Sequence, residues 1–323
     1  MKTNILLLSA GRRVELLKAF QRDLKVLGLS DARVFATDMH PALSPACLVA
    51  DQAFTVPRVT ASGYIDIIFN LCIEQQVRIV VPTIDTELLL LSAHKLRFAE
   101  QGITILISDQ QLIEQCRDKR ETGKLFDSLN IDNPKILDKN NLVFPCFCKP
   151  YDGSCSIGAV ALNSPEDLTL EQLNAPKNMF MELVPKSFYE YTIDAYYSNH
   201  GVLKCLVPRK RIEVRAGEVS KGVTRKNFVY DYLKERVIKL DGARGCITFQ
   251  LFVEEQTQSI KGLEVNPRFG GGFPLADAAG AHFTKWVIQE YILNQELSFT
   301  ESWETDLLML RYDAKVLSRN YVE

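Results

Sequence analysis

The chain has 323 residues, 46% of them hydrophobic, which is too long for one ordinary domain and predicts two or three packed units. Its 38 basic and 40 acidic residues give a net charge of -2, so no overall field would attract nucleic acid or a membrane surface. Any anion-binding site must therefore be local.

The cysteines and the start of the chain give expectations about location. Eight cysteines are scattered without the CxxC pairs of zinc or redox motifs, so we expect reduced and mostly buried thiols. The opening MKTNILLLSAGRRVELL has an apolar run too short for a signal peptide or a membrane span. We therefore expect a cytoplasmic protein.

Residues 4 to about 108 alternate strand and helix patterns, which predicts a parallel, doubly wound, Rossmann-like sheet. Strands are expected at 4–9, 33–38, 78–83 and 103–108, and helices at 12–28, 64–76 and 85–101. The first turn, SAGRR, holds a single glycine and does not match the GxGxxG fingerprint. NAD binding is therefore disfavoured.

Polar residues follow the expected strands at the sheet edge where open parallel sheets bind ligands. They are Gly11, Arg12, Asp38, Thr83, Asp85 and Glu87. Two interpretations stay open, ligand binding and ordinary turn or helix-capping chemistry, because both use the same loops.

From about residue 143 the sequence becomes rich in strand patterns, and its first motif is FPCFCKPYDGSCSIGAVAL. A strand ending in Lys149-Pro150 is followed by a loop of small residues and a second strand. Backbone N–H groups of such a loop can close over phosphates, although a plain hairpin would look the same. Farther on, Glu182 and Glu190 stand at strand ends, where carboxylates either bind purine and ribose groups or are simply solvated.

Residues 204–226 gather eight basic side chains without an interleaved aromatic residue to stack on bases. This composition favours a phosphate or carboxylate clamp over nucleic-acid binding, with a solvated strand face as the alternative. The eight are Lys204, Arg209, Lys210, Arg211, Arg215, Lys221, Arg225 and Lys226.

The stretch CITFQLFVEEQTQSIKGLEVNPRFGGG predicts two antiparallel strands joined by a turn. Glu264, Asn266 and Arg268 are two residues apart, so they project to one face of their strand, and the neighbouring strand can add Gln250. Oxygen ligands of this kind suit Mg²⁺ bound together with substrate phosphates, and Arg268 can neutralise a transferring phosphoryl group.

In this order and spacing the motifs resemble the ATP-grasp superfamily, in particular the branch similar to the carbamoyl-phosphate synthase large subunit. EVNPR after a strand with Gln250 is the most specific match, and KP before a Gly/Ser loop is the next. The resemblance covers nearly the whole chain and implies an α/β and α+β fold. It implies a Rossmann-like pre-ATP-grasp domain at 1–110, a small ATP-grasp subdomain with a flap at 111–185, and a large subdomain with a metal site at 186–323.

The resemblance implies a Mg-dependent carboxylate–amine ligase that forms carbon–nitrogen bonds through an acyl phosphate and releases ADP and phosphate. It implies that ATP is bound by Lys119, Lys149, Asp152, Gly153, Ser154, Ser156, Gly158, Glu182, Leu183, Val184 and Glu190. The implied Mg²⁺ (or Mn²⁺) ligands are Gln250, Glu264 and Asn266. Catalytic roles are expected for Arg268, Arg209 and Arg211, and substrate contacts for Arg215, Lys221, Arg225, Gly270, Gly271 and Gly272.

Two features depart from that family. Cys155 stands in the loop where relatives often carry glycine, and the chain has room for one ATP-grasp unit instead of two, so carbamoyl phosphate synthesis itself is not expected. The expected partners are a small carboxylate and an amine, without nucleic acid or membrane, and homodimer formation stays open. A non-catalytic nucleotide-binding regulator and, less favoured, a Rossmann oxidoreductase remain as alternatives.

Overall fold

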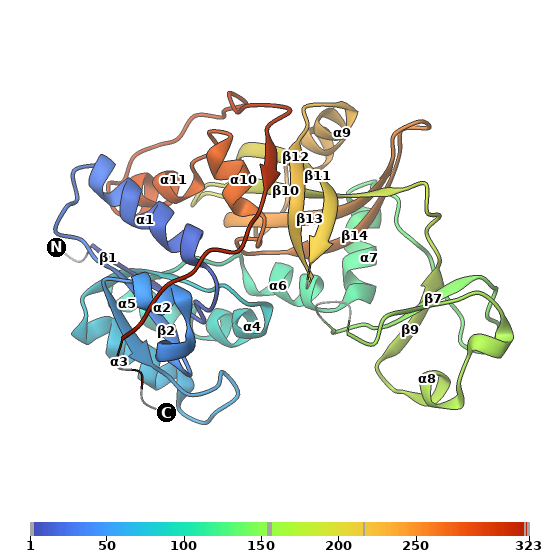
Figure 1. The fold of residues 1–323 in the computed structure, drawn as a ribbon, viewed down its shortest axis with the longest axis horizontal. Coiled ribbons are helices and arrows are strands. Elements are labelled where there is room, and N and C mark those ends of the chain that lie inside the picture. The colour runs from blue at the N-terminus through green and yellow to red at the C-terminus, as the bar shows by residue number, and fades with distance from the viewer. Residues whose placement is uncertain (1–2, 154–156, 216, 320, 322–323) are drawn as a thin grey trace.

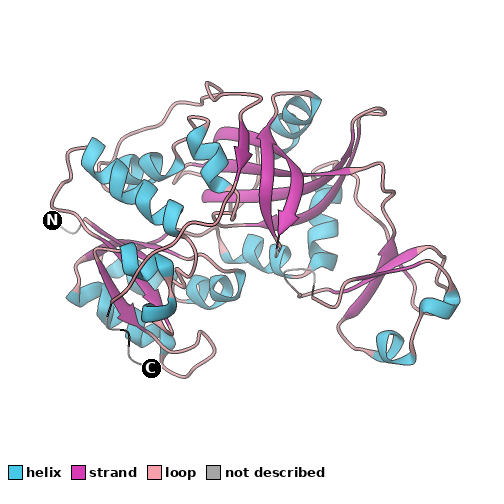
Figure 2. Cartoon of the chain, viewed as in Figure 1, coloured by secondary structure: helices cyan, strands magenta, loops and turns pink. Residues whose placement is uncertain are grey.

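The computed structural model describes residues 3–153, 157–215, 217–319 and 321. In this part of the chain the strands form three sheets (Figures 1 and 2). The first is a parallel five-stranded sheet in the order β3-β2-β1-β4-β5. Its strands are β1 (Asn4–Leu7), β2 (Val34–Asp38), β3 (Gln52–Thr55), β4 (Val77–Val81) and β5 (Thr104–Ile105).

Two details of this sheet differ from the sequence-based expectation. Strand β3 was not expected, because it is a short, partly exposed edge strand whose residues pair only with β2. The single helix expected at 85–101 is divided at His94 into α4 (Asp85–Ala93) and α5 (Lys95–Glu100). The other elements of this region are α1 (Val14–Val26), the 3₁₀ turn η1 (Pro41–Leu43), α2 (Pro45–Val49) and α3 (Tyr64–Glu74).

The two faces of β1 have different neighbours. Ile5 and Leu7 pack with α1 in the larger hydrophobic core, whereas Leu6 and Leu8 join the core formed with α3. Helix α1 in turn packs against α10 (Phe273–Ala278) and α11 (Phe283–Tyr291), so it connects the N-terminal sheet to the C-terminal half of the chain (Figure 1).

The second sheet is small and antiparallel, in the order β6-β9-β7-β8. Figure 1 shows it at the end of the molecule away from the N-terminal sheet. Strands β7 and β8 form the expected hairpin around the loop of small residues. The elements are β6 (Ile136–Leu137), β7 (Cys146–Pro150), β8 (Val160–Leu162), η2 (Pro165–Asp167), α8 (Leu170–Asn174) and β9 (Asn178–Glu182).

The third sheet is antiparallel, in the order β14-β13-β10-β11-β12-β15. Gln250 pairs with Glu264, which confirms the expected antiparallel neighbour. The strands are β10 (Tyr189–Tyr197), β11 (Leu203–Arg215), β12 (Glu218–Thr224), β13 (Gly245–Glu254), β14 (Ser259–Asn266) and β15 (Leu308–Leu310). The remaining helices are α6 (Gln110–Arg117), α7 (Lys119–Ser128) and α9 (Phe228–Val237).

Helix α7 packs against β14, and Gly262 permits this close approach, because a Cβ there would lie 2.5 Å from the Phe126 ring. The packing places the start of α7, with Lys119, beside the strand that carries Glu264. The fold class expected from sequence is confirmed, while the domain limits 1–110, 111–185 and 186–323 stay a prediction.

The seven cysteines in the described residues are buried, as expected, and Cys155 lies outside those residues. None of the described helices combines the length and the apolar character needed to cross a lipid bilayer.

Candidate functional site

A cleft of about 950 Å³ takes residues from all three sheets. Sixteen of the residues expected at the site line it, although they come from stretches up to 153 positions apart in the sequence. They are Lys119, Lys149, Gly153, Glu182, Leu183, Val184, Glu190, Arg209, Arg211, Gln250, Glu264, Asn266, Arg268, Gly270, Gly271 and Gly272.

Two lysines lie at the base of the flap. Lys149 on β7 is 7% exposed, and burial together with the nearby Lys119 ammonium lowers its pKa to about 8, with Glu264 opposing the fall. Lys119, the first residue of α7, donates to the Gly153 carbonyl and has its Nζ 3.7 Å from a Glu264 carboxylate oxygen. Two neighbouring ammonium groups with one carboxylate between them are suited to an anion with several charges.

Leu183 and Val184, which follow β9, line the cleft together with a group of apolar side chains. Leu183 and Val184 follow the last paired residue of β9, so their backbone groups are outside the ladder. Apolar walls with free backbone groups suit a flat heteroaromatic ring. The lining apolar residues here are Phe147, Met181, Leu183, Val184, Phe252 and Leu263.

Neither of the expected purine or ribose carboxylates is a free acceptor. Glu182 is exposed and accepts a hydrogen bond from the Lys135 backbone N–H at 3.2 Å. Glu190 accepts from Arg211, whose side chain is only 10% exposed. Arg211 therefore neutralises Glu190 and fixes its position at the cleft.

The expected metal ligands meet at one place. Gln250 on β13 stands opposite Glu264 on β14, and Asn266, 6% exposed, lies two residues farther along β14. One carboxylate and two amide oxygens fit a hard cation that keeps waters and shares phosphate oxygens. Within the described residues no three His, Cys, Asp or Glu side chains form a metal-binding group.

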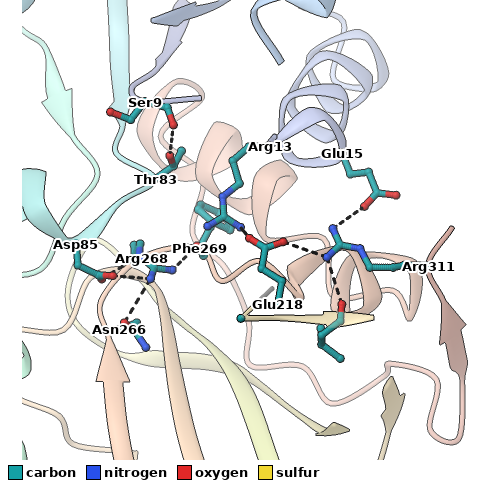
Figure 3. Close-up of polar contacts among 12 residues, drawn as sticks. Ser9, Arg13, Glu15, Thr83, Asp85, Glu218, Asn266, Arg268, Phe269 and Arg311 are labelled. Atoms are coloured by element: carbon teal, nitrogen blue, oxygen red, sulfur yellow. Dashed lines mark hydrogen bonds and ion pairs between the residues drawn. The ribbon is translucent and has the colours of Figure 1, made fainter. Parts of the chain in front are cut away.

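Arg268 connects this metal-ligand group to the N-terminal sheet. Its guanidinium donates two hydrogen bonds to Asp85, at 2.9 and 2.6 Å, and approaches the Asn266 side-chain oxygen at 3.4 Å (Figure 3). Asp85 is the first residue of α4, and its carboxylate pairs with Arg268. Of the two interpretations left open, Asp85 therefore shows a cleft-facing contact with the C-terminal half of the chain.

Arg209 on β11 is almost fully buried, 1% exposed, yet it lines the cleft. Its Nε–H donates to Asp194 at 2.9 Å, and Asp194 also accepts from Thr248 at 3.2 Å. Its Nη2 also pairs with Asp194 at 2.9 Å, whereas Nη1 has no partner among the described residues. Buried donors without partners are costly, so this guanidinium indicates an anion-binding position.

The glycines after EVNPR let arginines approach the backbone. A Cβ at Gly272 would lie 2.2 Å from Nη1 of Arg209, and a Cβ at Gly271 would lie 2.9 Å from Nη1 of Arg13. Any side chain at Gly272 would push Arg209 out of this place. The glycines therefore form part of the anion-binding wall.

Other expected site residues lie away from the cleft lining. Asp152 pairs with Lys177, and Gly158, with φ +73°, packs against Pro150. Ser154 and Ser156 lie outside the described residues. The loop's role over phosphates therefore stays a prediction.

Three basic residues expected to contact substrate also lie outside the cleft lining. Arg215 pairs with Asp313, Lys221 with Glu213 and Arg225 with Asp306, all in exposed surroundings. For these three the solvated alternative describes the structure, because each cation already has a carboxylate partner at the surface.

At the N-terminal sheet edge, Thr83 and Asp85 line the cleft, whereas Gly11, Arg12, Asp38 and Glu87 do not. Thr83 donates to the carbonyls of Leu8 and Ser9. Glu87 is fully buried and accepts from Ser9 and Tyr64, and burial raises its pKa to about 7. Through the bond with Ser9, Glu87 holds the loop after β1 in place.

Arg13 and Glu218 are among the cleft residues that the sequence analysis missed. Arg13 directly follows Arg12 in the SAGRR turn. The turn therefore indicated this place, but the sequence analysis named Arg12, which does not line the cleft. Glu218 opens β12 and carries no local motif, since its relation to the cleft arises only from the folded sheet.

Comparison with known proteins follows this geometry. Residues 5–106 match the family model described as "PylC-like, N-terminal domain", and residues 174–310 match the model described as "ATP-grasp in the biosynthetic pathway with Ter operon". The chain has the ATP-grasp fold. No curated protein matches the sequence.

Solved structures agree with this ATP-grasp assignment. The biotin carboxylase domain of Hydrogenobacter thermophilus 2-oxoglutarate carboxylase, in complex with MgADP, ADP and bicarbonate, has a TM-score of 0.74 at 15% identity. The match covers 95% of this chain and 73% of that one. An N5-carboxyaminoimidazole ribonucleotide synthetase in complex with ADP has a TM-score of 0.70 at 17% identity, over 93% of this chain and 79% of the other.

A third similar structure is Campylobacter jejuni biotin carboxylase, with a TM-score of 0.71 at 13% identity, covering 95% of this chain and 74% of that one. These similar structures show the fold, and the ATP-grasp family model matched by residues 174–310 agrees with the superfamily expected from EVNPR and the KP loop. They do not single out the carbamoyl-phosphate synthase branch.

Proposed function

We propose that this protein is an ATP-dependent carboxylate–amine ligase that forms carbon–nitrogen bonds through an acyl phosphate. The observation that carries the proposal is the buried guanidinium of Arg209, whose Nη1 has no partner among the described residues, in one cleft with the Lys119, Lys149 and Glu264 group. One end of the cleft suits a nucleotide with its metal, and the other suits an anion.

The nucleotide's base would lie between the apolar residues of the cleft, with its edge at the backbone of Leu183 and Val184. Lys119 and Lys149 would bind the phosphates. Gln250, Glu264 and Asn266 would hold Mg²⁺, or Mn²⁺ in its place, which supplies charge neutralisation between the β- and γ-phosphates. ATP and Mg²⁺ are thus the proposed cofactors.

The carboxylate substrate would bind at Arg209, over Gly272, with Asp194 holding the guanidinium in place. A carboxylate oxygen then attacks the γ-phosphorus, the bond from that phosphorus to the bridging β,γ-oxygen breaks, and ADP leaves. Arg268 neutralises charge on the transferring group, and Asp85 positions Arg268.

The second step joins the amine. Its nitrogen attacks the acyl carbon, the bond from carbon to the phosphate oxygen breaks, and inorganic phosphate leaves with an amide as product. No side-chain nucleophile is needed, so positioning and charge stabilisation supply the catalysis. Exclusion of water by the loop after Lys149 would protect the acyl phosphate from hydrolysis.

The similar structures support this proposal. One is a complex with MgADP and bicarbonate, and another is a complex with ADP. The nucleotide in these structures corresponds to the proposed nucleotide end of the cleft, and the bicarbonate corresponds to the proposed anion end.

The test is ADP release measured over a panel of carboxylate and amine pairs with Mg²⁺, with and without chelator. We expect one or more carboxylates to stimulate metal-dependent ADP release, and Glu264→Gln to reduce it at least about 100-fold. Glu254→Gln, at a half-buried residue at the end of β13 away from the cleft lining, is the matched control and should retain activity. Stimulation that survives in Glu264→Gln would refute the metal assignment, and a silent panel would favour a non-catalytic regulator.

A further inference from the structure

Arg13 is a cation of the N-terminal region that lines the cleft. It precedes α1 directly, in the loop that follows β1, and its side chain is 19% exposed. Figure 3 shows its guanidinium reaching from α1 toward Glu218. A mostly buried guanidinium at this place requires a counter-charge.

The counter-charge that the protein supplies is incomplete. The nearest carboxylate oxygen of Glu218 is 3.5 Å from Nη1 of Arg13, which is too long for a good hydrogen bond. Within the described part of the chain the Arg13 guanidinium makes this ion pair and no hydrogen bond. By contrast, Arg268 donates twice to Asp85 at 2.9 and 2.6 Å. Arg13 therefore keeps its donors free for a ligand.

Glu218 is shared between two arginines. Its other oxygen lies 3.3 Å from Arg311, in the segment after β15, and Arg311 is also 3.7 Å from Glu15 (Figure 3). Glu15 is 61% exposed, so solvent screens its charge. Arg13, which lines the cleft, and Arg311 beside it outweigh the half-buried Glu218 carboxylate, and the nearby Asp85 is already paired with Arg268. The excess positive charge attracts an anion and repels an ammonium group.

The glycine pair sets where this anion would lie. The Cβ position of Gly271 is 2.9 Å from Arg13 and 2.8 Å from the Glu218 carboxyl group, while that of the adjacent Gly272 is 2.2 Å from Arg209. The guanidiniums of Arg13 and Arg209 thus approach consecutive residues of one backbone segment. A single small molecule can reach both.

We propose that the carboxylate substrate carries a second anionic group, either another carboxylate or a phosphate, which Arg13 binds while Arg209 holds the reacting carboxylate. This inference rests on the proposed ligase function. When the second group binds, it takes the place of Glu218 beside Arg13, and Glu218 keeps Arg311 as its partner. Arg13 is then the residue that selects doubly anionic substrates.

The experiment measures binding to the full chain with Mg-ADP by calorimetry, using acids matched in chain length. Each straight-chain dicarboxylate from malonate to pimelate is compared with the monocarboxylate and the terminal amino acid of the same length. Phosphonate-ended acids of each length distinguish a phosphate site from a carboxylate site. We expect a doubly anionic acid to bind at least about 10-fold more tightly than its two matched relatives.

Three variants separate the explanations. Arg13→Gln should weaken binding of the doubly anionic acid at least about 10-fold without changing the affinity for Mg-ADP, which also confirms that the variant is folded. Glu218→Gln should strengthen it, because the competing carboxylate is removed. Arg12→Gln, an exposed neighbour, is the control and should change neither.

Equal binding of matched mono- and dicarboxylates, tighter binding of the amino-terminated acids, or an unchanged affinity in Arg13→Gln would each overturn the inference. These outcomes leave Mg-ADP binding and carboxylate-stimulated ADP release intact. Failure of the proposed ligase function would appear separately, as loss of that stimulation for every carboxylate tested.

Discussion

Replacing Lys149 with methionine should stabilise the free protein and at the same time abolish its response to nucleotide. Lys149 is 7% exposed on β7, and burial together with Lys119 lowers its pKa from 10.5 to about 8. Each unit of pKa corresponds to about 1.4 kcal/mol, so the buried ammonium costs the folded state about 3 kcal/mol at pH 7. Methionine has a similar shape and no charge to bury.

The pH dependence of this effect has a fixed sign. Because the pKa of the folded state is lower than that of the unfolded state, the cost is complete below pH 8. It decreases as the pH rises from about 8 to 10.5 and is absent above that range. The stability advantage of Lys149→Met should therefore decrease over the same interval.

The assay is urea unfolding at pH 7 and pH 10, together with the rise in melting temperature caused by Mg-ADP. We expect Lys149→Met to be more stable by about 1 to 3 kcal/mol at pH 7 and to lose most of the Mg-ADP effect. Lys124→Met is the control, because Lys124 is 73% exposed and its replacement should change stability by less than about 0.5 kcal/mol. A less stable Lys149→Met protein that keeps its response to Mg-ADP would refute the reasoning.

Three further predictions concern ionisation and close packing. In the wild type, affinity for Mg-ADP should fall by up to about 10-fold per pH unit above pH 8, because Lys149 loses its proton. An affinity that does not change with pH in titration calorimetry would contradict this. Glu87→Gln should stabilise the protein by up to about 3 kcal/mol above pH 7 and much less near pH 5. Burial raises the pKa of Glu87 from 4.5 to about 7, so its ionisation costs stability only at the higher pH. Equal stabilities of variant and wild type in urea at pH 8 would contradict this. Gly272→Ala should raise the KM for the carboxylate at least about 10-fold while Mg-ADP binding persists, because the new Cβ would lie 2.2 Å from Arg209. An unchanged KM would show that Arg209 beside Gly272 does not bind the carboxylate.

The parts of the site that follow from sequence are those set by local periodicity. The two-residue spacing in EVNPR predicts a shared face for Glu264 and Asn266, and the short turn before it predicts Gln250 on the neighbouring strand. Both are present in the antiparallel pair β13–β14. The flap hairpin after Lys149 is similarly local, because a strand, a loop of small residues and a second strand adjoin in sequence.

Other parts depend on tertiary contacts that no local pattern encodes. Arg268 and Asp85 are 183 residues apart and meet only in the folded chain, where the start of α4 lies beside the turn after β14. The basic cluster at 204–226 likewise contains cations with different environments. Arg209 is buried and pairs with the buried Asp194, with no partner for its Nη1 among the described residues, whereas Arg225 pairs with Asp306 at the surface. Composition alone does not distinguish the two.

The secondary-structure differences have the same origin. Edge strand β3 is short and half exposed, so it lacks the alternating apolar pattern, and its pairing with β2 defines it. The helix break at His94 lies inside an apolar run that continues on both sides, so periodicity gave no reason to divide it.

The central claim is an acyl phosphate formed at Arg209, and transfer of an oxygen isotope tests it most directly. With ¹⁸O in both oxygens of the carboxylate that best stimulates ADP release, the account predicts one ¹⁸O atom in each phosphate released, measured by mass spectrometry. The label should be transferred only with Mg²⁺ and should be nearly absent with Glu264→Gln. Phosphate that carries no label during carboxylate-stimulated turnover, or the absence of any stimulating carboxylate, would contradict the account.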